Sequence, residues 1–345
     1  MFDKILVANR GEIALRVIRA CKELGIRTVA IYSEADRNAL HVRFADESVC
    51  VGPPPAQYSY LHIPNVVTAA EITGVDAVHP GYGFLAENIA FAESLASHGI
   101  GFIGPRPDSL ETFGDKLSAK AAARAAGVPL LPGSPGAVAD VEEAVRLADE
   151  IGYPLMLKAA FGGGGKGMRI VRDQSQLRRA FELTSAEAAA SFGNGALFLE
   201  RFLATPRHIE VQIAGDGAGG AIHIGERDCS MQRRHQKIIE EAPAAGLSDD
   251  LRERIRAAAV NLARHTRYRT VGTVEFLVEG DEFWFLEVNP RIQVEHPVTE
   301  QVTGVDLVQL QIQLAAGSPL PLRQEEISIR GHAIEVRVNA EDPWT

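Results

Sequence analysis

The chain has 345 residues, a formal net charge of −10 and only 6% aromatic residues. This length accommodates two or three domains with buried cores, and the composition is that of an ordinary α/β protein. An acidic chain does not produce the positive field that gathers nucleic acid or anionic lipid, so neither is expected as a partner. Any anion must be bound by a local site.

The three cysteines, Cys21, Cys50 and Cys229, lie far apart in the sequence and form no CxxC pair. Neither a zinc site nor a disulfide framework is expected, and a reducing cytosol is the simplest environment for such a chain. The first residues show no basic and apolar leader, and no apolar run reaches the length of a membrane span. We therefore expect a cytoplasmic protein that does not enter a membrane.

The N-terminal segment has the pattern of a strand, a helix and a second strand. Residues 4–9 form a short apolar run, apolar residues recur at helical spacing over 13–24, and residues 27–32 form another apolar run. Gly25 stands where a glycine commonly ends a helix. The turn at residues 10–11 has one glycine where a dinucleotide fingerprint has three, so the pattern disfavours a nicotinamide site.

The α/β pattern continues to about residue 115, and prolines and glycines over 129–136 then mark a hinge. The next segment is compact, and we interpret it as a mobile lid. Its predicted elements are a helix at 140–151, strands at 155–159 and 168–171, and a helix at 175–190. From Ile209 onward strands dominate, with helices predicted at 250–265 and 306–316.

Residues 161–167 read Phe-Gly-Gly-Gly-Gly-Lys-Gly. A P-loop needs GxxxxGK followed by Ser or Thr between a strand and a helix, but here Lys166 precedes Gly167 and both flanks have strand patterns. The segment is therefore predicted to be a hairpin flap whose backbone N–H groups close over phosphates. Lys116 and Lys158 are expected to bind the same polyphosphate, with two exposed surface lysines as the alternative.

Two carboxylates are predicted to face each other across a hairpin. Strands at 271–278 and 283–288 joined by a three-residue loop place Glu275 opposite Glu287, with Asn289 on the same side. Buried together, the carboxylates repel, and a hard divalent cation removes that penalty. We favour a metal site over two solvated glutamates.

The next segment carries charged side chains at alternate positions. If it is extended, Arg291, Gln293 and Glu295 point to one side. A guanidinium binds a planar oxyanion and a carboxylate beside it acts as a general base, whereas the alternative is a surface ion pair. The basic run 232–237 lies in an acidic chain, so a small-anion pocket fits it better than nucleic acid.

These motifs together resemble biotin carboxylases, which are ATP-grasp enzymes. The residues that carry the resemblance are the flap, Glu275, and the runs 5–14, 79–85, 287–289 and 291–296. The resemblance spans Lys4 to Thr345 and implies an α/β ATP-grasp fold. Its parts would be a Rossmann-like (pre-ATP-grasp) domain at 1–115, a linker and mobile glycine-flap lid at 116–203, and a mainly antiparallel catalytic domain at 204–345, which is expected to be incomplete at its C-terminus.

The resemblance also implies the residues of an active site. ATP would be bound by Lys116, Lys158, Gly164, Gly165, Glu200, Arg201, Leu203, His208, Gln232, His235, Glu275 and Glu287. Mg²⁺ or Mn²⁺, two ions in all, would be held by Glu275, Glu287 and Asn289. Bicarbonate would be held by Lys237, Arg291, Gln293, Val294 and Glu295, and biotin by Tyr82 and Arg337. The catalytic residues would be Lys237, Arg291, Glu295 and Arg337.

The implied reaction is the ATP-dependent carboxylation of biotin. Bicarbonate would attack the γ-phosphate to give carboxyphosphate, with Glu295 as the base, and Arg337 would steady the biotin enolate that captures CO2. The chain contains no Met-Lys-Met tripeptide for biotinylation. Biotin would therefore arrive on a biotin carboxyl carrier protein, with carboxyltransferase subunits or domains and a homodimer as further partners.

The sequence leaves open the final acceptor of the carboxyl group and two alternative functions. The final acceptor would be that of an acetyl-CoA, propionyl-CoA or pyruvate carboxylase, and we expect acetyl-CoA carboxylase of fatty acid synthesis. Another ATP-grasp ligase that acts on a different carboxylate is one alternative function. A non-catalytic ATP-binding module is the other.

Overall fold

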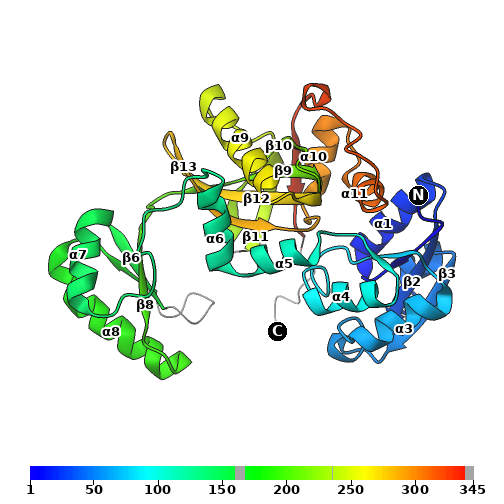
Figure 1. Cartoon of the computed structure of the whole chain (residues 1–345), viewed down its shortest axis with the longest axis horizontal. Helices are drawn as coiled ribbons and strands as arrows, with labels where there is room; N and C mark the ends of the chain where they lie inside the picture. The colour runs from blue at the N-terminus through cyan, green and yellow to red at the C-terminus, as the bar shows by residue number, and fades with distance from the viewer. Residues whose placement is uncertain (160–167, 235, 339–345) are drawn as a thin grey trace. The chain divides into compact units, whose positions relative to one another are not determined.

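The computed structural model describes residues 1–159, 168–234 and 236–338, and Figure 1 labels many of its helices and strands. They form two compact units. The first combines Met1–Val128 with the chain from Arg207 onward, and the second is Pro129–Pro206. The predicted flap at 161–167 lies outside the described residues. Within those ranges, no helix combines the length and apolar character that crossing a membrane requires.

A five-stranded parallel sheet with the order β3-β2-β1-β4-β5 forms the N-terminal part of the first unit (Figure 1). This confirms the predicted strand, helix and strand at the start of the chain, and Gly25 follows the first helix with φ +73°. The strands are β1 Lys4–Val7, β2 Arg27–Ser33, β3 Glu47–Gly52, β4 Ala77–His79 and β5 Gly101–Phe102. The helices are α1 Gly11–Glu23, α2 Leu40–Phe44, α3 Ile63–Thr73, α4 Ile89–Ser97, α5 Pro107–Gly114 and α6 Lys116–Ala125.

The strand order of this sheet reverses between β1 and β4, and ligands of open α/β sheets bind outside the carboxyl ends of the strands at such a point. Asn9, which follows β1, donates hydrogen bonds to the carbonyls of Pro80 and Tyr82 at 2.7 and 2.8 Å. Gly81 has φ +65°, and a Cβ there would lie 3.0 Å from the Asn9 amide nitrogen. The close approach of the two loops therefore requires glycine and fixes Tyr82 at the sheet edge.

A six-stranded antiparallel sheet with the order β13-β12-β9-β10-β11-β14 forms the rest of the first unit (Figure 1). Its strands are β9 Arg207–Asp216, β10 Ala221–Arg233, β11 Gln236–Ala242, β12 Arg269–Glu279, β13 Glu282–Asn289 and β14 Ala333–Val336. The helices are α9 Asp249–His265, α10 His296–Thr303 and α11 Leu307–Ala315. Helices α9 and α11 agree with the patterns predicted at 250–265 and 306–316.

The two sheets of the first unit share one apolar core. Val17 of α1 and Ile312 of α11 belong to the same buried cluster as Ala214 of β9 and Val271 of β12. A fully buried valine or isoleucine side chain contributes about 1.5–3 kcal/mol to folding. The shared core therefore couples the edge of the parallel sheet to the antiparallel sheet.

The second unit consists of a three-stranded antiparallel sheet, β7-β6-β8, and two helices. Its elements are α7 Val141–Ile151, β6 Leu155–Ala159, β7 Met168–Val171, α8 Gln174–Phe192 and β8 Leu197–Arg201. Both helices begin at an aspartate cap, Asp140 and Asp173, whose carboxylate accepts a backbone N–H of the first turn. The pairing of β6 with β7 confirms that strands flank the glycine segment on both sides.

His79, at the end of β4, is fully buried and accepts a hydrogen bond at Nδ1 from the Gly81 N–H at 3.0 Å. Burial lowers the pKa of His79 to about 3; the charge of Arg16 adds to this, and the neighbouring Gln311 amide opposes it. The unfolded chain, with an ordinary histidine pKa of about 6.5, therefore takes up a proton that the folded chain refuses. This contribution to stability is present above pH 6.5 and is lost as the pH falls toward 3.

We predict that the substitution His79→Asn, which keeps an acceptor for the Gly81 N–H, flattens the pH dependence of stability. Between pH 7 and pH 5 the wild type should lose about 2 kcal/mol more unfolding free energy than the variant. Urea unfolding at the two pH values measures this, with exposed His265→Asn as the control. Equal losses in wild type and His79→Asn would contradict the assignment.

Candidate active site

A cavity of about 530 Å³ opens in the first unit. Its lining comes from the loop after β4, from β9 to β13, and from the segments that follow β13 and β14. The lining residues are Tyr82, Gly83, His208, Gln232, Arg234, Gln236, Lys237, Glu275, Glu287, Asn289, Arg291, Gln293, Val294, Glu295 and Arg337. The structure thus brings together twelve sequence-predicted site residues of this unit in one cavity.

The hairpin of β12 and β13 does place Glu275 opposite Glu287, but not through the predicted turn. Glu279 pairs with Glu282, so the loop has two residues, Gly280 and Asp281, rather than three. With that turn alone, Glu275 would fall out of register with Glu287. A bulge at Leu286 shifts the pairing by one residue and restores the facing carboxylates.

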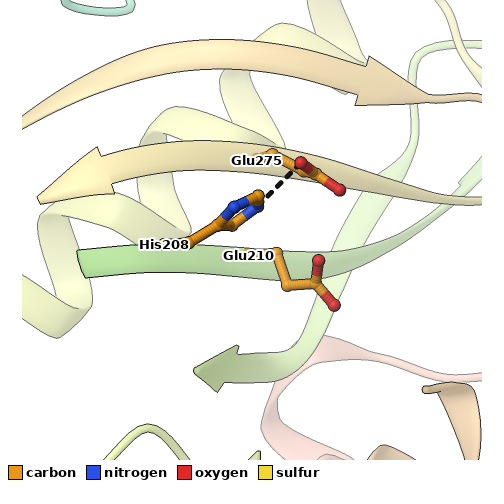
Figure 2. A group of neighbouring side chains, drawn as sticks. All are labelled: His208, Glu210 and Glu275. Carbon is orange, nitrogen blue, oxygen red and sulfur yellow. Dashed lines mark ion pairs between the residues drawn. The ribbon is translucent and has the colours of Figure 1, made fainter. Parts of the chain in front are cut away.

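Glu275 is almost completely buried and lies beside His208 and Glu210 of the neighbouring strand β9, as Figure 2 shows. His208 Nε2 is 2.7 Å from one carboxylate oxygen. The other oxygen accepts hydrogen bonds from Lys237, Asn289 and Gln293 at 2.7–2.9 Å. Burial by itself would raise the pKa of Glu275, but the His208 hydrogen bond and the Lys237 charge keep it below its usual value.

The ammonium of Lys237, from β11, sits among three carboxylates. It donates hydrogen bonds to Glu210 at 2.6 Å, to Glu275 at 2.9 Å and to Glu295 at 2.7 Å. Burial would lower the pKa of Lys237, yet the charges of Glu210, Glu275 and Glu295 raise it well above its usual value. Lys237 is therefore a permanent cation at the floor of the cavity.

Glu287 faces the cavity and keeps contact with solvent. Desolvation by the cavity wall raises its pKa, the repulsion of Glu275 raises it further, and the charge of Lys116 at the start of α6 works in the other direction. Lys116 itself is exposed and does not line the cavity. Glu275, Glu287 and Asn289 present carboxylate and amide oxygens, the donor set that Mg²⁺ prefers. In the described residues, Asn289 directs its amide nitrogen to Glu275 and accepts from Arg291 at 2.9 Å.

The segment after β13 is not extended, which corrects the prediction. Residues 290–295 form an irregular loop and α10 begins at His296, because the turn at Val294 and Glu295 leads the chain into the helix. Arg291, Gln293 and Glu295 still line one cavity. Arg291 is half-buried, and its Nε lies 3.2 Å from Glu87 of the N-terminal part.

Arg337, which follows β14, joins two buried carboxylates. Its guanidinium donates to Glu240 of β11 and, at 2.9 Å, to Glu295. Burial would lower the pKa of Arg337, but Glu295 and Glu240 raise it. Glu335 lies on β14, two residues before Arg337. Burial and the charges of Glu240 and Glu295 raise the pKa of Glu335 to about 7. Arg337 and Lys237 thus both donate to Glu295, Lys237 from β11 and Arg337 from the position after β14.

The remaining predicted ATP residues divide among three places. Gln232 lines the cavity and donates its amide to His208 Nδ1 at 3.0 Å. Lys158, Glu200, Arg201 and Leu203 belong to the second unit, where Lys158 forms an ion pair with Glu200. Gly164, Gly165 and His235 lie outside the described residues.

Three buried charged residues of the site were not predicted from the sequence: Glu210, Arg227 and Glu240. A signal for the first exists in β9, where His208, Glu210 and Gln212 alternate with apolar residues. Such alternation is typical of a half-exposed strand, yet Glu210 and Gln212 are fully buried. Arg227 lies fifteen residues after Gln212 in the sequence and reaches it only because β9 pairs with β10. No local sequence pattern indicates this contact.

Comparisons with known proteins match this architecture. Residues 1–110 match the family described as biotin carboxylase, N-terminal domain, and residues 115–323 match the family described as carbamoyl-phosphate synthase L chain, ATP binding domain. The chain is 56% identical to a biotin carboxylase of Pseudomonas aeruginosa, over 100% of this chain and 77% of that protein. It is 53% identical to a pyruvate carboxylase subunit of Methanothermobacter thermautotrophicus, over 99% of this chain and 70% of that protein.

A solved structure with the same fold is the biotin carboxylase domain dimer of Hydrogenobacter thermophilus 2-oxoglutarate carboxylase, in complex with MgADP, ADP and bicarbonate. It superposes with a TM-score of 0.87 at 52% identity, and the match covers 100% of this chain and 76% of that one. The fold and the sequence agree with the predicted ATP-grasp architecture. The chain belongs to the biotin carboxylase family of ATP-dependent enzymes.

Proposed function

We propose that this chain carboxylates biotin with bicarbonate at the expense of ATP, and that the cavity of the first unit is the site of this reaction. The observation that carries the proposal is the convergence of Lys237, Arg291 and Arg337 on a cavity that also contains Glu275 and Glu295. Fixed cations favour a small anion, and the carboxylates supply a base and ligands for a hard metal.

The bicarbonate ion is proposed to lie against Arg291 with Lys237, Gln293, Val294 and Glu295 around it. A guanidinium presents a planar fork that matches the planar oxyanion. Glu295 is the proposed base that takes the bicarbonate proton. Its carboxylate receives hydrogen bonds from Lys237 and Arg337, so it is oriented before substrate arrives.

The metal and nucleotide are proposed to occupy the end of the cavity formed by Glu275, Glu287 and Asn289. Mg²⁺ would neutralise phosphate charge as the bicarbonate oxygen attacks the γ-phosphate. The Hydrogenobacter thermophilus structure, with MgADP and bicarbonate bound, supports both ligands for this chain. His208, Gln232, Lys116 and His235 are proposed to contact ATP from the first unit, and Gly164 and Gly165 are proposed to contact it from the second. Lys158, Glu200, Arg201 and Leu203 are proposed to do so from the second.

Biotin is proposed to enter beside Tyr82 and Arg337, carried by a biotin carboxyl carrier protein that works with a carboxyltransferase. We propose acetyl-CoA as the final acceptor and the cytoplasm as the location, which the three free cysteines support. The relatives named for pyruvate and 2-oxoglutarate make those acceptors the competing ones. Co-purification with a carboxyltransferase specific for either keto acid would contradict acetyl-CoA.

Phosphate release from ATP tests the proposed reaction directly. With Mg²⁺ and free biotin, release should depend on bicarbonate and yield carboxybiotin. Turnover that ignores bicarbonate but responds to an amino acid would instead indicate another ATP-grasp ligase. Nucleotide binding without any bicarbonate-stimulated release would indicate a non-catalytic module.

We predict that Glu287→Gln lowers metal-dependent turnover by about 100-fold or more, because Lewis-acid stabilisation is worth several kcal/mol. The fold should persist, since Glu287 keeps contact with solvent. Steady-state phosphate release and Mn²⁺ titration measure the effect. Glu282→Gln, an exposed change on the same hairpin, is the matched control. Wild-type turnover in Glu287→Gln would remove Glu287 from the metal site.

We predict that Arg337→Ala separates the two parts of the reaction. Carboxybiotin formation should fall about tenfold more than bicarbonate-dependent ATP hydrolysis, because one charge-assisted contact to biotin is lost. Exposed Arg330→Ala serves as the control. An equal loss of the two activities would count against a role for Arg337 at biotin.

A further inference from the structure

We infer that Arg227 is a positioning residue for the bicarbonate site, because it fixes the amide of Gln293 and, through Glu210, the ammonium of Lys237. This inference rests on the proposed function, which places bicarbonate against Gln293 and Lys237. Arg227 does not line the cavity and its side chain is completely buried, so it acts only through other residues.

All five N–H donors of the Arg227 guanidinium are used. Nε donates to Glu210, and the two terminal nitrogens each donate two hydrogen bonds. The acceptors are Gln212 at 2.7 Å and Thr299 at 2.9 Å for one nitrogen, and Gln293 at 2.8 Å and Thr273 at 3.2 Å for the other. These acceptors come from β9, β12, α10 and the loop before α10. These five hydrogen bonds therefore fix the orientation of the guanidinium plane.

The first consequence concerns Lys237. Glu210 is fully buried, and one of its oxygens accepts from Arg227 while the other accepts from Lys237 at 2.6 Å. Arg227 thus shares the negative charge of Glu210. Without Arg227, the full negative charge of Glu210 would act on Lys237. The Lys237 ammonium would then attract a substrate anion less strongly.

The second consequence concerns Gln293. Because its amide oxygen accepts from Arg227, its amide nitrogen faces the cavity side and donates to Glu275 at 2.9 Å. Rotating the amide by half a turn would place two donors against each other at Arg227. The guanidinium therefore selects one of the two amide orientations of a residue that lines the cavity.

Lysine cannot replace this arrangement. An ammonium has three donors and no planar fork, so it can satisfy Glu210 but not the five acceptors around a fixed plane. Arg227→Lys retains the charge that neutralises Glu210 and removes the constraint on Gln293. It is the sharpest variant for the test.

Steady-state phosphate release should be measured for Arg227→Lys at varied bicarbonate and at varied ATP. We expect the KM for bicarbonate to rise about tenfold or more, as the loss of one aligned charge-assisted contact implies. The KM for ATP should change by less than about threefold. If Arg227 had only a structural role, its replacement would change the KM for bicarbonate and the KM for ATP by similar factors.

The matched control is Arg256→Lys. Glu226 precedes Arg227 on β10, is buried, and forms an ion pair with Arg256 of α9 at 2.7 Å, so the same exchange is made at a buried carboxylate outside the site. Arg256→Lys should keep both KM values within about twofold of the wild type. Thermal unfolding of each variant reports whether it folds.

The double variant Thr273→Val and Thr299→Val decides the matter if Arg227→Lys does not fold. It deletes two acceptors of the guanidinium, keeps all charges, and should raise the bicarbonate KM about threefold with ATP unaffected. A folded Arg227→Lys, or this double variant in its place, with a wild-type bicarbonate KM would overturn the inference. An equal rise in the ATP KM would do the same. A wild-type chain without bicarbonate-dependent phosphate release would instead show that the proposed function is wrong.

Discussion

The site depends on the balance of buried charge between three carboxylates and two cations. Glu210, Glu275 and Glu295 are almost completely withdrawn from solvent, and isolated carboxylates in such surroundings are costly. Arg227 and Lys237 both donate to Glu210, each to a different carboxylate oxygen. Because Lys237 also reaches Glu275 and Glu295, one ammonium links strands β9, β11 and β12 with the loop before α10.

This charge balance accounts for the proposed chemistry. The buried carboxylates already have cationic partners, Arg337 among them, and Arg291 lines the same cavity. An anionic substrate therefore meets preorganised donors, and stabilisation of developing charge costs little rearrangement. The loop after β4, at the point where the strand order of the parallel sheet reverses, contributes Tyr82 to the cavity lining. Asn9 holds this loop by donating a hydrogen bond to the Tyr82 carbonyl.

Much of this site could be predicted from the sequence, because its motifs lie on contiguous segments. The run from Glu287 to Glu295 is contiguous in the sequence. The alternation that predicts β6 and β7 is likewise contained within each short segment. The position of Glu275 opposite Glu287 was predicted correctly, but from a three-residue turn that does not exist. The actual two-residue turn and the bulge at Leu286 compensate each other, and a bulge leaves no clear mark in a periodic pattern.

The buried partners could not be predicted in the same way. Arg227 and Glu240 have ordinary surface-like sequence surroundings, and only the pairing of β9, β10, β11 and β14 brings them inside. The irregular course of residues 290–295 likewise depends on the packing of α10 rather than on alternation. Sequence patterns identified many of the side chains that line the cavity, whereas the buried side chains that hold them required the tertiary structure.

The central claim is that a bicarbonate oxygen attacks the γ-phosphate of ATP within this cavity. Its most direct test is turnover with ¹⁸O-labelled bicarbonate in the presence of biotin, followed by mass spectrometry of the released phosphate. The account predicts one ¹⁸O atom transferred into each phosphate formed. Phosphate that carries no label, its new oxygen having come from water instead, would contradict it.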